Sequence, residues 1–409
     1  MSYDSNATGI GAAGANSSSP NKKKQKMSPP LESLLLAGEE ISIQGILPFV
    51  GVGLETFCNQ PRAEFWLKDN SYHKTPDRDH VCTAIATVGN LTVMQWARRQ
   101  KEIFPWDEET CARAAKNGQL EMLIWLRENG CPWNERTCEK AAQGGHLDVL
   151  KWAHENGCPW NALTCASAAE GGQLEILKWA RENGCPWTYL TCLEAAAEGH
   201  LEILKWAREN GCPWHPWACA DAARHGHLEI LKWARENGCP WDEQTCTYAA
   251  QFGNLEIFKW TRENGCPWDA RTCAKAARHR HLEIFKWARD NGCPWDERTC
   301  TSAAEEGHLQ ILKWAGDNGC PWSGMTSYGA ALYGQLETLK WACENGCPLD
   351  DETCEAAAEN GHLEVLNWAR ENGCPWSAAT YQAACQHNRR EVIQWLGDSG
   401  CPGSRDEGH

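Results

Sequence analysis

The stretch TCAKAARHRHLEIFKWARDNGCPWD, from Thr272 to Asp296, contains the pattern that decides the fold of this chain. It has the features of a helix, a turn, a second helix and a tight exit. Its Gly-Cys-Pro triplet recurs every 27 residues, with the cysteine at Cys131, Cys158, Cys185, Cys212, Cys239, Cys266, Cys293, Cys320, Cys347, Cys374 and Cys401. A fixed period of this size predicts a solenoid, in which each unit buries its apolar face against its neighbours.

The helix boundaries are marked within each unit. Asp296 suits an N-cap, and the apolar residues after it recur at about one turn, which predicts a first helix. Gly307 ends that helix, and Leu309 begins a second helix whose apolar residues share one face. Gly319 suits a left-handed C-terminal cap, and Pro321 stops the helix from continuing. No strand pattern is present, so an all-α array is expected.

The string AARHRHLEIFKWARDNGCPWD resembles the ankyrin repeat, which has a paired alanine, a Gly-His-Leu-Glu turn, an aliphatic second helix and a Gly-Ala-Asp exit. The chain departs from that pattern in three ways. Thr-Cys replaces the family's Thr-Pro-Leu-His start, Trp replaces a leucine of the second helix, and six residues of the hairpin finger are missing. The resemblance therefore implies an ankyrin-like α-solenoid with shortened fingers, of about twelve helix-turn-helix repeats, over residues 77–409.

Tryptophan and cysteine, at 24 residues each, follow the repeat. Twelve Trp lie on the second helices and ten follow the Cys-Pro or its equivalent, and we expect both sets to contribute to the core. A Cys-x6-Cys-x7-His spacing, as in Cys293, Cys300 and His308, could suggest zinc. However, eight helical residues span about 12 Å, too far for ligands of one ion. We expect small buried thiols, with Cys293 and Cys300 as the pair of nearby cysteines, and no metal or cofactor.

The N-terminal part differs in composition from the array. Residues 1–30 are polar and of low complexity, with a lysine cluster at Lys22, Lys23, Lys24 and Lys26, and are expected to be a disordered tail. Residues 31–76 predict a small helical module that caps the first repeat. Its Leu47-Pro48 start also resembles an F-box, which implies docking onto the adaptor of a cullin-type ubiquitin ligase.

Composition excludes several classes of protein. A net charge of −15 disfavours nucleic-acid binding. No apolar run reaches the roughly 20 residues that a membrane span needs, and no signal peptide is present, which indicates an intracellular protein, cytoplasmic or nuclear. Every His, Cys or Glu that could suggest chemistry is repeated along the array, so no distinct catalytic constellation exists. We expect a monomer that is not an enzyme.

Comparison of the units shows where the side chains vary, after the Cys-Pro-Trp and after the paired alanine. By resemblance to ankyrin arrays, these positions lie on the concave face that meets a partner. The middle units carry aromatic and basic residues there, which are typical of binding hot spots. We call this set the predicted stripe: Tyr189, Trp217, Arg224, Tyr248, Phe252, Arg271, Arg278 and Arg280.

The predicted stripe favours a non-catalytic protein-interaction scaffold whose partner is an acidic, partly apolar peptide or domain. Two other functions remain open. The chain could be the substrate receptor of a cullin-type ubiquitin ligase, or its cysteines could make it a metal or redox buffer.

Overall fold

The computed structural model describes residues 81–99 and 104–404. The predicted tail at 1–30 and the predicted cap or F-box-like module at 31–76 lie outside these residues. Both therefore stay predictions.

Within the described ranges all regular structure is helical, as the sequence predicts, and the helices form pairs. The first helix of each pair is odd-numbered: α5 (Val81–Val88), α7 (Glu108–Lys116), α9 (Glu135–Gly144), α11 (Ala162–Glu170), α13 (Tyr189–Ala197), α15 (Trp217–His225), α17 (Glu243–Gln251), α19 (Ala270–Arg278), α21 (Glu297–Glu305), α23 (Gly324–Leu332), α25 (Asp351–Asn360) and α27 (Ala378–Gln386). The second helix is even-numbered: α6 (Leu91–Arg99), α8 (Leu120–Glu128), α10 (Leu147–Glu155), α12 (Leu174–Glu182), α14 (Leu201–Glu209), α16 (Leu228–Glu236), α18 (Leu255–Glu263), α20 (Leu282–Asp290), α22 (Leu309–Asp317), α24 (Leu336–Glu344), α26 (Leu363–Glu371) and α28 (Arg390–Asp398).

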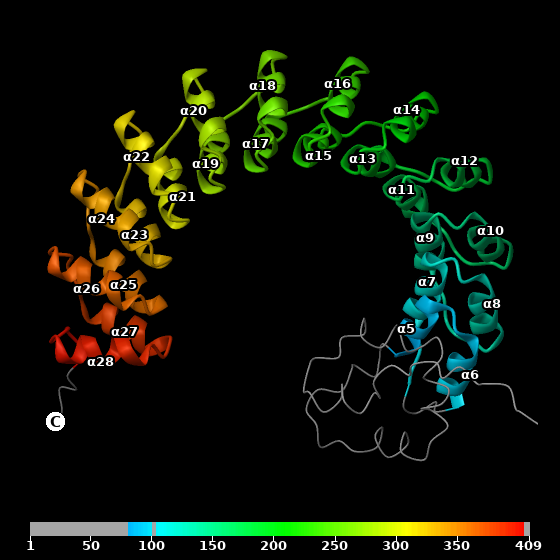
Figure 1. Ribbon diagram of the computed structural model, residues 1–409, viewed down its shortest axis with the longest axis horizontal. Helices are drawn as coiled ribbons and strands as arrows, with labels where there is room; N and C mark the ends of the chain where they lie inside the picture. Colours follow the sequence, from blue (N-terminus) through cyan, green and yellow to red (C-terminus); the bar gives the residue numbers. More distant parts are fainter. Residues whose placement is uncertain (1–80, 100–103, 405–409) are drawn as a thin grey trace, which may run out of the picture.

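The twelve pairs stack into a curved solenoid. Successive odd-numbered helices pack against one another and follow the inner side of an arc, while the even-numbered helices follow its outer side (Figure 1). Each first helix also packs on the second helix of its own unit. The inner side therefore presents one face of every first helix to a common concave space.

The local signals act as the sequence predicts. The Asp296 carboxylate accepts a hydrogen bond from the Arg298 backbone N–H at 3.1 Å and caps α21. Gly307 and Gly319 have φ values of 70° and 75°, a left-handed conformation that glycine adopts without steric cost. They turn the chain after α21 and after α22.

The core runs the length of the array. In a typical unit, the first helix buries Thr164, Cys165 and the alanine pair, and the second helix buries Ile176, Leu177 and Ala180. Small residues on the first helix allow the inner layer to pack closely, and the aliphatic residues of the second helix fill the space between the layers.

The tryptophans lie at the margin of this core, half-buried and packed against it. The indole after each Cys-Pro contacts the indole of the next second helix edge-on, as Trp187 and Trp206 do at 5.9 Å. The guanidinium of Arg181 lies 4.3 Å from the Trp187 ring centre and donates a hydrogen bond to the Cys185 carbonyl. This arginine–tryptophan–tryptophan group recurs along the array and links consecutive units.

Across residues 81–99 and 104–404, no helix has both the length and the apolar character that crossing a lipid bilayer requires.

Candidate functional site

The exposed face of the first helices forms three rows of side chains along the inner side of the arc. The face opposite the buried Thr-Cys and alanine pair takes residues at i, i+4 and i+7, such as Trp217, Asp221 and Arg224 on α15. Neighbouring helices align their equivalent positions. From α11 to α19, the row at the helix starts contains Leu163, Leu190, Trp217, Gln244 and Arg271; the middle row contains Ser167, Glu194, Asp221, Tyr248 and Lys275; the row at the helix ends contains Glu170, Ala197, Arg224, Gln251 and Arg278. Ala197 is the buried member of these rows.

Apart from Tyr248 in the middle row, the predicted stripe divides between the two ends of these helices. Tyr189, Trp217 and Arg271 lie in the first turns of α13, α15 and α19, whereas Arg224 and Arg278 lie in the last turns of α15 and α19. The ends of the stripe are therefore separated by the length of a nine-residue helix, roughly 12 Å.

Aromatic contacts organise both groups. The His215 ring stacks on Tyr189 with centroids 4.6 Å apart and meets the edge of Trp217 at 5.1 Å. At the other end, the Arg224 guanidinium lies 4.9 Å from the centre of the Phe252 ring. Trp217 and Phe252 are nevertheless 54% and 42% exposed, which leaves both rings accessible to a partner.

Two arginines of the predicted stripe are already paired with carboxylates of the array. Arg271 contacts Asp269 at 2.7 Å and Glu243 at 3.0 Å, and the hydrogen bond that its guanidinium donates to Asp269 raises the pKa of Arg271. Arg278 contacts Glu306 at 3.2 Å and Glu305 at 3.4 Å. The charges of these two arginines are therefore balanced within the chain.

Arg280 has a backbone conformation that favours glycine. It follows α19 with a φ of 63°, and the equivalent position in most other units is a glycine, such as Gly253 or Gly307. A bulky side chain in the left-handed region is strained, and such strain is frequent at functional positions.

Sequence comparison did not identify two carboxylates of the inner face. Glu194 and Asp221 occupy the middle row on α13 and α15, between the residues of the predicted stripe. Burial raises the pKa of both, and the nearby Glu170 carboxylate raises that of Glu194 further. Both stand at the same repeat position as Tyr248 and Lys275, so their place in the repeat already indicates the inner face.

The thiols form pairs other than the one expected. Cys293 lies beside Cys273, twenty residues earlier in the same unit, rather than beside Cys300, which neighbours Cys320. The neighbouring Cys273 and burial raise the pKa of Cys293. Cys320 and burial raise the pKa of Cys300 in the same way. In most units the second thiol also donates to the carbonyl of the N-cap residue, as Cys293 does to Asp269 at 3.6 Å. These cysteine contacts thus join the end of the second helix to the start of the first helix of the same unit.

The histidine of the turn has a structural partner. His308 Nε2 lies 2.9 Å from the carbonyl oxygen of Arg278, at the end of the first helix of the preceding unit. His281 contacts the Gln251 carbonyl in the same way at 3.0 Å, and Asn254 donates to the Ala223 carbonyl at 2.8 Å. These contacts satisfy helix-end carbonyls. In the described parts of the chain, no group of three or more His, Cys, Asp or Glu side chains could hold a metal ion.

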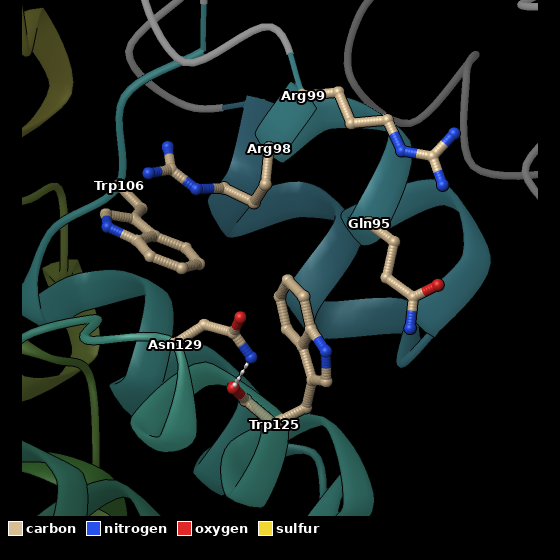
Figure 2. Close-up of a pocket in the computed structure, with 6 residues that line it drawn as sticks. All are labelled: Gln95, Arg98, Arg99, Trp106, Trp125 and Asn129. Carbon is tan, nitrogen blue, oxygen red and sulfur yellow. Dashed lines mark hydrogen bonds between the residues drawn. The ribbon is translucent and has the colours of Figure 1, made fainter.

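A pocket of about 480 Å³ lies at the N-terminal end of the array, between α6 and α8 (Figure 2). Its lining residues are Gln95, Arg98, Arg99, Trp106, Trp125 and Asn129. The Arg98 guanidinium lies 3.6 Å from the Trp106 ring centre, so the pocket includes the first of the arginine–tryptophan contacts. Its lining residues are far along the chain from the predicted stripe. One of them, Arg99, directly precedes residues 100–103, which are outside the described ranges. We assign it no ligand.

Comparison with known proteins identifies the repeat. Residues 219–261, from α15 to α18, match the family described as ankyrin repeats in many copies. The unit that recurs along the array is therefore similar to an ankyrin repeat. Among solved structures, the chain is similar to the human ASB11 ankyrin repeat domain, with 20% identity, a TM-score of 0.33, and coverage of 38% of this chain and 84% of that one. No curated protein matches the chain. The expected resemblance to the ankyrin repeat is therefore confirmed for residues 219–261.

Proposed function

We propose that this protein is a non-catalytic scaffold that binds a protein partner on the inner face of its ankyrin array. One observation carries the proposal. The repeated Thr, Cys, Ala, Ile and Leu side chains form the buried core, whereas side chains that differ from unit to unit lie on the inner face of the first helices. A surface that varies on a constant framework is suited to recognising one particular partner.

The predicted stripe is the proposed contact region. Trp217 begins α15 and Phe252 directly follows α17, and both present large, accessible rings. Such residues supply most of the binding energy of many interfaces. Arg280 supports the proposal because its strained backbone has no evident structural benefit.

An acidic, partly apolar partner segment is the proposed ligand of the α17–α19 end of the stripe. Lys275 and Arg280 form no ion pair with any residue in the described ranges, and Arg224 is stacked on Phe252 rather than paired with a carboxylate. Carboxylates of a partner could engage these three cations while an apolar side chain contacts Phe252.

The experiment is capture of partners by the full chain and by a triple variant, Trp217→Ala, Phe252→Ala and Arg278→Ala. Cross-linked proteins would be identified by mass spectrometry, with Lys259→Ala and Lys286→Ala on the outer helices α18 and α20 as the control. We expect the triple variant to lose partners that the control retains. Equal capture by both would refute the proposed site.

The ubiquitin-ligase function depends on residues 31–76 and is a separate proposal. Its support is the Leu47-Pro48 motif in the sequence. Co-purification of a cullin adaptor with the full chain, lost on Leu47→Ala and Pro48→Ala, is the expected result if the motif is an F-box. Failure to retain any adaptor would remove this function and leave the scaffold proposal intact.

A further inference from the structure

The inner face of α11, α13 and α15 differs in chemistry from the α17–α19 end of the array. Its helix starts are apolar, with Leu163 and Trp217 44% and 54% exposed. One turn further along lie carboxylates on α13 and α15, and a third lies at the end of α11. We call this set the acidic patch: Leu163, Leu190, Trp217, Glu170, Glu194 and Asp221.

Two carboxylates of the acidic patch lack a cation. Neither Glu194 nor Asp221 forms an ion pair with a residue of the described ranges, although both are half-buried. Arg224 and His225 on α15 lower the pKa of Asp221 without outweighing its burial, and both have other contacts: Arg224 lies over Phe252, and His225 Nδ1 lies 2.7 Å from the Ala197 carbonyl.

Elsewhere on the inner face, carboxylates receive an arginine from the neighbouring unit. Glu109 on α7 pairs with Arg136 on α9 at 3.0 Å, and Glu243 on α17 pairs with Arg271 on α19 at 3.0 Å. The array can thus supply a cation across adjacent first helices, and it does so on either side of the acidic patch. The patch itself is left with half-buried negative charge, which is costly unless a cation arrives from elsewhere.

We infer that the acidic patch binds a segment of another protein in which lysine or arginine alternates with large apolar side chains. The cations would meet Glu194 and Asp221, and the apolar side chains would cover Leu163 and Trp217. Three helices at about 9–10 Å spacing span roughly 20 Å, which about six residues of extended chain can cover. This inference goes beyond the acidic partner proposed for α17–α19, because it assigns a second ligand of opposite charge to a neighbouring surface that shares Trp217 with the predicted stripe.

The test is selection of a random displayed-peptide library on the full chain, followed by affinity measurements with the recovered peptides. We expect peptides that carry Lys or Arg together with Leu, Phe or Trp. Glu194→Gln with Asp221→Asn should weaken their binding about tenfold or more, since each removes the charge of a hydrogen-bonded ion pair. Removing two negative charges from the outer helices of the same units, by Glu202→Gln and Glu229→Gln, should have little effect.

Several outcomes would overturn the inference: recovery of no peptide, recovery of acidic peptides only, or equal loss of binding in the Glu194/Asp221 variant and the outer-helix control. Binding that strengthens when Lys22, Lys23, Lys24 and Lys26 are replaced by alanine would also overturn it, because the chain's own tail would then be the occupant. Phe252→Ala with Arg278→Ala should leave these peptides bound, which separates this test from that of the acidic partner.

Discussion

Replacement of Arg280 by glycine should stabilise the array and weaken binding of an acidic partner. Arg280 takes the left-handed conformation, with a φ of 63°, where Gly253 of the preceding unit has a φ of 80°. The backbone of the turn therefore already has the shape that glycine prefers. The arginine side chain forms no ion pair with residues of the described ranges that would compensate for the strain.

The expected gain follows from two opposing terms. A left-handed conformation costs an L-residue about 1–2 kcal/mol. Glycine also makes the unfolded chain more flexible, which reduces the gain in stability by about 0.4–1 kcal/mol. Arg280→Gly should therefore raise the free energy of unfolding by about 0.5–1 kcal/mol.

The reverse change at the equivalent position is the matched control. A Cβ atom at Gly253 would lie 2.6 Å from Cε1 of His281, whose Nε2 contacts the Gln251 carbonyl at 3.0 Å. Gly253→Arg adds the strain that Arg280→Gly removes, and it displaces a hydrogen-bonded ring worth about 1 kcal/mol. We expect it to destabilise the array by about 1.5–2 kcal/mol.

Urea unfolding followed by circular dichroism measures the midpoint, and hydrogen exchange of α19 and α20 localises the change, since repeat arrays can unfold in parts. Partner capture by the same Arg280→Gly protein gives the functional measurement. A destabilised Arg280→Gly protein would refute the strain argument. A stabilised protein that binds its acidic partner unchanged would refute the role of Arg280 in the stripe.

Three further predictions concern the framework. Burial lowers the pKa of His308 below 6.5, so the unfolded chain binds more protons than the folded array, and stability falls as the pH drops below about 6.5. In urea titrations at pH 7 and pH 5, His308→Gln should reduce this loss of stability. A variant with the same pH dependence as the original chain would contradict this prediction. Alkylation of the native protein, followed by mass spectrometry, should modify the exposed Cys385 first and spare Cys343, because burial raises the pKa of Cys343 to about 12. Early labelling of the paired, buried thiols would contradict the packing described above. A metal chelator should leave the melting temperature unchanged, because the turn histidines contact backbone carbonyls. A lower melting temperature in the presence of the chelator would support the metal-buffer hypothesis.

The acidic residues of the inner face also bear on stability. Because burial raises the pKa of Glu194 and Asp221, the folded array binds more protons than the unfolded chain in the acid range above their ordinary values. Their ionisation near neutral pH therefore opposes folding, and Glu194→Gln with Asp221→Asn should not unfold the array. A loss of peptide binding in that variant would then report on the surface itself.

Local chemistry was sufficient to determine the secondary structure and the repeat. Asp296 as an N-cap, and Gly307 and Gly319 as left-handed residues, act through groups a few residues away, so their roles follow from their order in the chain. The 27-residue period fixed the stacking of equivalent helices, because units of the same shape repeat the same contact. The all-α ankyrin-type array was therefore predictable from the sequence alone.

The tertiary structure decided which side chains remain available. The pairing of Cys273 with Cys293 and the contact of His308 with the Arg278 carbonyl join residues twenty and thirty positions apart, which spacing along one helix cannot reveal. The stacking also brings Glu305 and Glu306 to Arg278, and it leaves Glu194 and Asp221 half-buried without a cation. Charge balance on the inner face depends on distances between side chains of neighbouring units, and those distances exist only once the units are stacked.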